Sequence, residues 1–472
     1  MTRRLPRVLR FFDISVLASA AMGPAYSIAS TMGPLVAAAG GLAPVSLVAL
    51  GAIMLCIAIG FSQLARVAPN AGSSYSWIRL AFGSRAGAYG AWLLLLSNFF
   101  ATMAIAVPAG IYTLDLLAPN RAQDPVWDAA VGAVWIIGST ILLYVGLRPT
   151  AVVTATALAL ELGVLGVSAA VALVLPHHAI PHPVGAAGVS GAQVAGVSLF
   201  GFITAMTLGV WMSDGWEVSA SASEEVQGDG REAGRGGIMG LVVTMIVLAG
   251  ATAAYLHLGS IAGFVANQAD AMRYVADLLG SGAWRPVIIT TVLVSTCSTL
   301  WTTILYLSRS VFAMGRDGVL PRALGKLDAR NEPLWSLAVV AILVTACELL
   351  TGFSKTAADA LNAVLNASSV FLGLLFVFSA AAATRIFWKT ARRWRGVIIP
   401  SIGAAALLGV IGATIATEDR SLQLIALVGL LIGIPFAFWR SDAPAVAGSD
   451  RHARLLLERD RVFATAAQVS ED

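Results

Sequence analysis

Hydrophobic residues occur in long runs separated by short polar segments, and these runs predict the elements of the fold. Helices are expected at about residues 14–39, 43–65, 86–117, 128–147, 150–175, 196–222, 237–262, 284–313, 334–352, 358–385, 396–416 and 421–440. A helix of about 20 apolar residues is needed to cross a bilayer. Apolar residues make up 58% of the chain and charged residues 12%, against about 25% charged residues in soluble domains. The pattern predicts an all-α integral membrane protein with about 12 transmembrane helices and excludes a large soluble protein.

The positive charges predict how these helices are oriented. If the N-terminus is cytoplasmic, the inner segments hold 25 of the 30 Lys and Arg residues and the outer segments hold 5. Such an excess is typical of cytoplasmic loops. We therefore expect a multi-pass protein of the cell membrane (inner or plasma membrane), with both termini cytoplasmic. A tail would cover 1–13, a membrane domain 14–440 and a second tail 441–472.

Two of the predicted helices are interrupted in the middle of the membrane. The first interruption reads Met22-Gly23-Pro24-Ala25-Tyr26-Ser27, and the second reads Trp211-Met212-Ser213-Asp214-Gly215-Trp216-Glu217. An unpaired backbone group costs several kcal/mol in hydrocarbon, so a broken helix is tolerated only where it is buried or lines a cavity. Paired breaks in the two halves of a many-helix protein indicate the substrate site of a transporter.

Three further stretches share features of one transporter family. The first is Ala65-Arg66-Val67-Ala68-Pro69-Asn70-Ala71-Gly72-Ser73-Ser74-Tyr75-Ser76-Trp77, with Phe82-Gly83. The second is Asp214-Gly215-Trp216-Glu217, with Glu224-Glu225. The third runs from Ser308-Arg309 to Ala313-Met314-Gly315-Arg316-Asp317-Gly318-Val319-Leu320-Pro321. Together they resemble the hallmarks of the amino acid–polyamine–organocation transporter superfamily, and the third stretch is the most specific.

This resemblance implies a fold of two inverted five-helix repeats with discontinuous first and sixth helices. The repeats would cover about 14–175 and 196–385, followed by peripheral helices at about 396–440. It also implies a secondary active transporter (permease) that moves amino acids between the two sides of the membrane.

The first break is expected to bind the substrate through its backbone. The N-terminus of a half-helix is a site for a carboxylate, and unwound carbonyls accept hydrogen bonds from an ammonium group. The family usually has Gly-Ser-Gly where this chain has Gly23-Pro24-Ala25. Pro24 has no N–H to donate, so the usual carboxylate cradle is altered. The predicted substrate-binding residues are Met22, Gly23, Pro24, Ala25, Tyr26, Ser27, Trp211, Asp214, Gly215 and Trp216.

Buried acids are the candidates for proton coupling. A carboxylate within the membrane is costly and therefore usually functional, which singles out Glu217 and Glu161. In the family, an acid at the position of Glu217 often couples gating or protonation to transport. Glu225 and Arg316 are expected at a cytoplasmic gate, where Glu224 and Glu225 would pair with Arg309 and Arg316.

Several alternatives stay open from the sequence. The hydroxyl side chains at 295–303 are compatible with sodium coupling in place of proton coupling. Asp214 and Pro24 are compatible with an amine or polyamine carrier, or with an exchanger. A sensor that binds amino acids without moving them is a third alternative. Neither a catalytic constellation nor a basic-aromatic pattern for nucleic acid is evident, and no cofactor is expected. Three cysteines within spans and the histidines His177, His178 and His182 in a proline-rich loop do not form a predicted metal site.

Overall fold

The computed structural model describes residues 5–439 except 123, 177–197, 229, 268–270, 281, 356, 391 and 418–419. The histidine-containing loop and the predicted C-terminal tail therefore lie outside the described residues. Within the described residues the chain is helical, and its one β-type contact is a parallel bridge between Leu9 and Val226.

Helices occur at each of the predicted spans. Their bounds are α1 (Phe11–Ala21), α2 (Pro24–Ala39), α3 (Ala43–Val67), α4 (Ser73–Phe82), α5 (Ser84–Leu117), α6 (Pro125–Val145), α7 (Leu147–Val174), α8 (Leu199–Met212), α9 (Val218–Ser221), α10 (Gly230–Leu258), α11 (Ile261–Ala266), α12 (Ala271–Leu278), α13 (Trp284–Arg316), α14 (Leu334–Thr351), α15 (Ala357–Phe387), α16 (Ile399–Thr417) and α17 (Arg420–Trp439). Short 3-10 helices include Ala222–Glu225 and Arg322–Gly325. The sequence pattern did not predict α4, α11 and α12, which are short helices between spans.

The described residues contain nine helical stretches long and apolar enough to cross a membrane. The first of these, Phe11–Val67, combines α1, α2 and α3, and two shorter apolar helices cover Leu199–Met212 and Gln423–Phe438. The protein is thus a multi-pass, all-helical membrane protein. The division into two inverted repeats stays a prediction.

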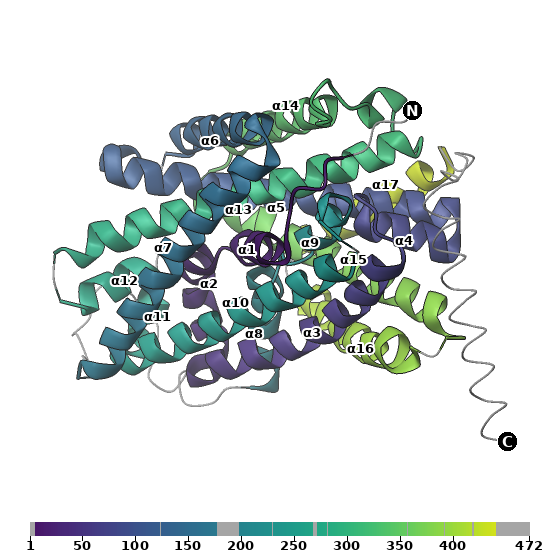
Figure 1. Ribbon diagram of the computed structural model, residues 1–472. Coiled ribbons are helices and arrows are strands. Elements are labelled where there is room, and N and C mark those ends of the chain that lie inside the picture. Colours follow the sequence, from purple (N-terminus) through teal and green to yellow (C-terminus); the bar gives the residue numbers. More distant parts are fainter. Residues whose placement is uncertain are drawn as a thin grey trace, which may run out of the picture.

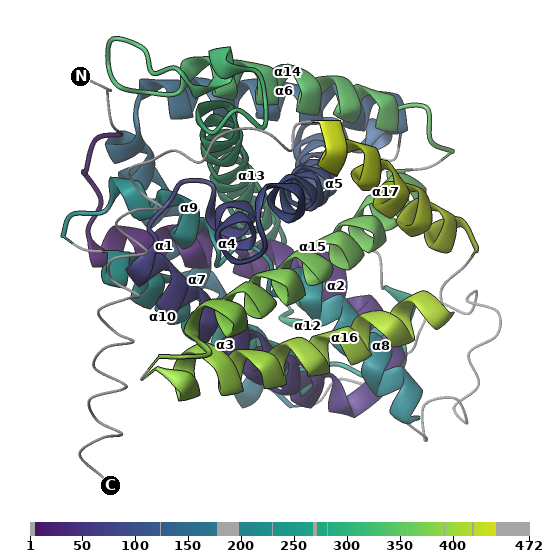
Figure 2. The same cartoon turned by 90° about the vertical axis from the view of Figure 1, so that its right-hand side faces the viewer.

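The centre of the bundle holds the broken helices and the two longest spans. In Figure 1, α1 and α2 lie in the middle of the molecule, surrounded by α5, α7, α10 and α13. More than two thirds of the apolar part of α5 and of α13 is buried, whereas α14 buries little more than a quarter. Figure 2 shows α15 and α16 side by side; two thirds of the apolar part of α15 is buried, whereas α16 is more exposed.

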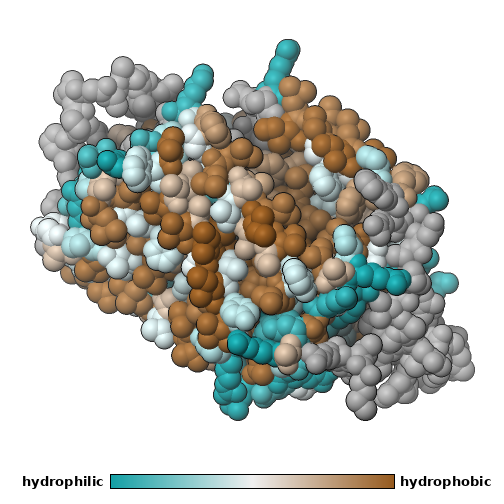
Figure 3. Space-filling view, turned by 90° about the horizontal axis from the view of Figure 1, so that it is seen from above, coloured by the Kyte–Doolittle hydropathy of each residue, from teal (hydrophilic) through white to brown (hydrophobic). Residues whose placement is uncertain are grey.

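The outer surface is apolar, as contact with lipid requires. Large hydrophobic side chains such as Leu117, Val174 and Phe353 are at least 80% exposed. On the face seen in Figure 3, hydrophobic residues cover most of the described area, and hydrophilic side chains gather towards its margins. An apolar outer surface on a helix bundle is typical of a protein that lies in a lipid bilayer.

Candidate functional site

Both predicted breaks are present. Helix α1 ends at Ala21, and α2 begins at Pro24 after Gly23, whose φ is +51°. Helix α8 ends at Met212, and a turn containing Gly215, with φ +111°, precedes α9. Glycine adopts these positive φ values at little cost, and a residue with a Cβ does not.

The two breaks lie against each other. A Cβ added at Gly215 would lie 2.5 Å from the backbone carbonyl of Ala21, and one added at Gly23 would lie 2.2 Å from Oγ1 of Thr299 on α13. Each glycine therefore provides both an unusual backbone angle and space for a neighbour. The consequence is that α1, the turn after α8, and α13 meet at one point.

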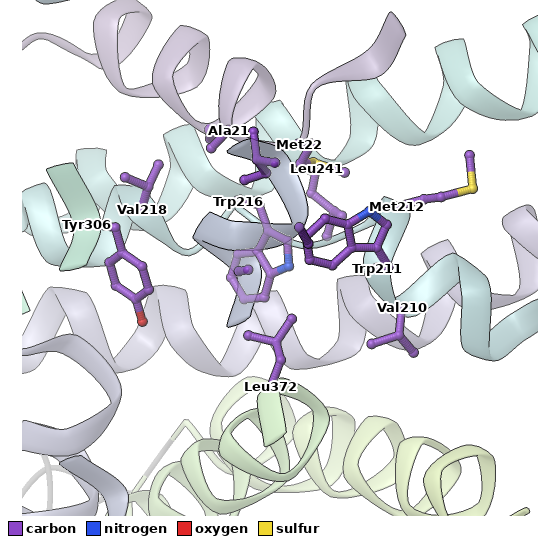
Figure 4. Close-up of a cluster of buried hydrophobic side chains, with 14 of the residues drawn as sticks. Ala21, Met22, Val210, Trp211, Met212, Trp216, Val218, Leu241, Tyr306 and Leu372 are labelled. Atoms are coloured by element: carbon purple, nitrogen blue, oxygen red, sulfur yellow. The ribbon is translucent and has the colours of Figure 1, made fainter. Parts of the chain in front are cut away.

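A cavity lies at this meeting point. Its lining residues come from both breaks, from α5 and from α13: Ala21, Met22, Tyr26, Ser27, Asn98, Ile105, Trp211, Asp214, Gly215, Glu217, Val218, Thr299, Thr302, Thr303 and Tyr306. The volume of about 20 Å³ leaves room for roughly one water molecule. Figure 4 labels five of the lining residues: Ala21, Met22, Trp211, Val218 and Tyr306. In this conformation the central cavity is therefore too narrow for an organic substrate.

The N-terminus of α2 is already bonded to side chains of the protein. The N–H of Ala25 donates to Oε2 of Glu161 on α7 at 3.3 Å, and the N–H of Tyr26 donates to Oγ of Ser295 on α13 at 3.1 Å. Glu161 is fully buried, and its carboxylate takes the position that helix N-termini offer to anions. In this conformation the two N–H groups are not free for a substrate carboxylate.

At the second break, too, a backbone N–H donates a hydrogen bond to a carboxylate of the protein. The N–H of Gly215 donates to Oε2 of Glu217 at 3.1 Å, directly before α9 begins. The Glu217 and Asp214 carboxyl groups are close neighbours, and both line the cavity. Glu217 is 1% exposed, while Asp214 is half-buried. The part of the cavity wall formed by the second break is thus acidic.

The two tryptophans at the second break have different surroundings. Trp211 lines the cavity, and its buried Nε1 has no hydrogen-bond partner among the described residues. Trp216 does not line the cavity, although its indole lies beside that of Trp211 in Figure 4. The Trp216 ring packs edge-on against Phe61, at a centroid distance of 4.9 Å. It is tilted by 37° against the ring of Phe376, at a centroid distance of 5.4 Å.

The structure brings half of the predicted site residues to the cavity. Those that line it are Met22, Tyr26, Ser27, Trp211, Asp214, Gly215 and Glu217; those that do not are Gly23, Pro24, Ala25, Trp216, Glu161, Glu225 and Arg316. Five further lining residues were not predicted from the sequence: Ala21, Asn98, Ile105, Val218 and Tyr306. A lone Asn within an apolar run is a signal for Asn98, but Ile105 carries no such signal.

A network of ion pairs lies at one end of the bundle. Arg309 donates to both oxygens of Glu225, at 3.0 and 3.2 Å, and to Glu332 at 2.8 Å. Arg316 donates to both oxygens of Glu224 at 2.8 Å. The expected pairs of Glu224 and Glu225 with these arginines are therefore present. They join the segment after α9 to the C-terminal part of α13.

The N-terminal segment reinforces the same end. The N–H groups of Val8 and Leu9 donate to the carbonyl of Glu225 at 2.9 and 3.0 Å, and the N–H of Gln227 donates to the carbonyl of Leu9 at 2.8 Å. Leu9 is fully buried and Leu5 is 5% exposed. The residues before α1 thus form a strap (residues 5–10) bonded to the segment that carries the ion pairs.

Two facing helix breaks around a narrow cavity in an apolar bundle are typical of secondary transporters. No group of three or more His, Cys, Asp or Glu residues in the described part of the chain is arranged to hold a metal ion. The cavity itself is lined by acidic, hydroxyl and apolar side chains.

Comparisons with known proteins agree with this class. Residues 9–446 match the amino acid permease family. The chain is 26% identical over 312 residues to the branched-chain amino acid permease BcaP of Lactococcus lactis, covering 61% of this chain and 65% of that protein, just under two thirds of its length. It is 26% identical over 357 residues to BcaP of Bacillus subtilis, covering 70% of this chain and 71% of that protein.

A further relative covers more of the chain. An uncharacterized transporter of Mycobacterium tuberculosis is 27% identical over 384 residues, which are 78% of this chain and 81% of that protein. Because the family match covers most of its length, the chain belongs to the amino acid permease family. The resemblance to the amino acid–polyamine–organocation superfamily is thereby confirmed.

Proposed function

We propose that this permease carries a zwitterionic amino acid with an aliphatic side chain, by alternating access and together with a proton. The observation that carries the proposal is the narrow cavity between the two breaks, because it joins an acidic wall to an apolar one. The two inverted repeats, the cytoplasmic termini and a gate at the ion-pair network belong to the same proposal.

The acidic side of the cavity suits the substrate ammonium group. Asp214 supplies a carboxylate, and the hydroxyl of Ser27, which donates to the carbonyl of Met22 at 2.7 Å, keeps its lone pairs as acceptors. Among the side chains that line the cavity, Trp211 has a buried indole N–H without a hydrogen-bond partner in the described part of the chain, and we assign it to the substrate carboxylate. An unpaired buried donor costs about 1–3 kcal/mol, so a ligand acceptor there is favoured.

The apolar side of the cavity suits an aliphatic side chain. Met22, Ile105 and Val218 line it, and two relatives carry the name branched-chain amino acid permease. Since the cavity has room for roughly one water molecule in this conformation, substrate entry requires the surrounding helices to separate. We propose leucine, isoleucine and valine as the first substrates to test.

Proton coupling is assigned to Glu217 with Asp214, and to Glu161. Two neighbouring carboxyl groups in a site of low polarity do not both ionise readily, so one proton is shared between them. A proton on Glu161 would weaken its hold on the N–H of Ala25. Protonation would then free the N-terminus of α2 to move as the cavity opens.

Uptake by purified protein in liposomes tests this function. Wild-type protein should accumulate leucine under an inward proton gradient, and an uncoupler should abolish accumulation. Glu161→Gln should retain leucine counterflow but lose the response to the gradient, and the partly exposed Glu232→Gln is the matched control. Accumulation that ignores the gradient and the uncoupler would contradict proton coupling. Binding without flux would instead favour a sensor.

An amine carrier is the second candidate, and a specific observation favours it. The N–H groups of Ala25 and Tyr26 are bonded to Glu161 and Ser295, while the cavity presents Asp214 and Glu217. A thermal-shift panel of amino acids, monoamines and polyamines separates the two candidates, because a ligand at 100 times its Kd stabilises by about 2.7 kcal/mol. Stabilisation by amines alone would replace the amino acid by an amine as substrate.

A further inference from the structure

A second hollow lies on the outer surface, remote from the central cavity. It is a groove of about 640 Å³ between the end of α4, α15 and α16. Its walls are mostly apolar and include Phe82, Val377, Ala405 and Leu408. Figure 2 shows α15 and α16 running side by side. Phe82 and Leu408 in the groove are each 46% exposed, so the groove opens at the outer surface and not towards the substrate pathway.

One end of the groove is polar and positively charged. Thr384 and Ser401 line it and hydrogen-bond to each other at 2.9 Å. Arg385 and Trp388 also line it, and both side chains are exposed. Among the described residues, Arg385 forms none of the ion pairs. A cation and an indole at the end of an apolar groove match the depth of lipid headgroups.

The turn that follows α15 concentrates further positive charge. Residues 385–395 contain five cations and no acid: Arg385, Lys389, Arg392, Arg393 and Arg395. The guanidinium of Arg393 lies over the Trp388 ring, at 5.3 Å from its centroid. Trp394 is 70% exposed. Clusters of this size beside a transmembrane helix attract anionic lipids.

We propose that this groove binds an anionic phospholipid from the leaflet that the charge distribution predicts to be cytoplasmic. An acyl chain lies along Val377, Ala405 and Leu408, and the phosphate meets Arg385. Thr384 and Ser401 provide hydroxyls at the depth of the ester groups. A phospholipid fits both parts of the groove. Its acyl chains cover the apolar walls, and its negative charge complements the cations of residues 385–395.

The groove also touches the ion-pair end of the bundle. Phe82 is the last residue of α4, and one turn earlier Arg79 pairs with Asp317 at 3.5 Å. Tyr75 on the same helix donates a hydrogen bond to Asp317. A lipid packed against Phe82 therefore stabilises α4 where it contacts the end of α13. We expect the lipid to stabilise the closed state seen here.

The test uses the full-length protein in nanodiscs of phosphatidylcholine, with and without phosphatidylglycerol. Bound phosphatidylglycerol is counted by native mass spectrometry, and the Tm is measured in parallel. Phosphatidylglycerol should be retained by the wild type and raise its Tm. Arg385→Gln should weaken retention about fivefold, since one interfacial cation contributes about 1 kcal/mol.

Two further variants separate the groove from general surface charge. Ala405→Trp fills the exposed groove without altering charge and should also reduce retention. Arg322→Gln removes an exposed cation from a different surface segment and should leave retention unchanged. Equal retention in the wild type, Arg385→Gln and Ala405→Trp would overturn the proposal, as would an equal loss in Arg322→Gln.

Discussion

The hydroxyl of Tyr26 donates a hydrogen bond of 2.6 Å to the backbone carbonyl of Ala104. Within α5 this carbonyl would normally accept from the N–H four residues later, but that residue is Pro108, which has none. Tyr26, on the first half-helix after the break, therefore supplies the missing donor. A proline in α5 and a tyrosine in α2 form one structural unit beside the central cavity.

Removal of this hydroxyl should destabilise the protein. Tyr26→Phe leaves the buried Ala104 carbonyl without a donor, which costs about 1–3 kcal/mol. The double variant Tyr26→Phe, Pro108→Ala should recover much of this loss, because replacing the proline restores the helical N–H. Thermal unfolding of the four proteins of this double-mutant cycle measures the coupling. Additive effects would show that the hydrogen bond does not contribute in this way.

The helices and the two breaks were predictable from the sequence, because each leaves a local signal. Apolar runs mark the spans, and Gly23-Pro24 and Asp214-Gly215 mark the interruptions. The bond from Ala25 to Glu161 was not predictable, since it joins residues 136 positions apart. Ile105 was not predicted because α5 is apolar on all sides. Its sequence therefore does not indicate which face of the helix points towards the cavity. The strap was missed because its backbone bonds depend on no particular side chains.

Gly215 and Gly228 provide a matched pair for testing the contact between the breaks. Both have positive φ, but a Cβ on Gly215 would meet Ala21, whereas nothing lies within 4 Å of one on Gly228. Gly228→Ala should cost about 1–2 kcal/mol through backbone strain alone. Gly215→Ala should add about 1–3 kcal/mol of overpacking and abolish uptake. Similar losses of Tm and uptake in the two variants would show that the close approach is unimportant.

The buried ion pair should matter more than the exposed one. Arg309 and Glu225 are 2% and 0% exposed, whereas Arg235 and Glu232 are 52% and 34% exposed. Glu225→Ala leaves a buried guanidinium with only Glu332 and should cost about 3–5 kcal/mol. Glu232→Ala should change stability by less than about 1 kcal/mol. Thermal unfolding measures both changes.

The same pair of variants tests the proposed gate. If the network closes the cytoplasmic end, Glu225→Ala should increase labelling of a Ser27→Cys reporter, in a background without native cysteines, by a reagent added from the cytoplasmic side. Glu232→Ala should leave this labelling at the level of the reporter protein alone. Unchanged labelling in a folded Glu225→Ala protein would contradict the gate.

The strap should hold the segment after α9 in place. Leu9 is fully buried, so Leu9→Ala should cost about 2–5 kcal/mol locally. Hydrogen exchange should then accelerate at the amides of Val8, Leu9 and Gln227, which take part in the strap's backbone bonds. Phe12→Ala is the control, since Phe12 is 68% exposed and its loss leaves those bonds intact. If exchange at Gln227 is equally slow in Leu9→Ala and Phe12→Ala, the strap does not depend on the burial of Leu9.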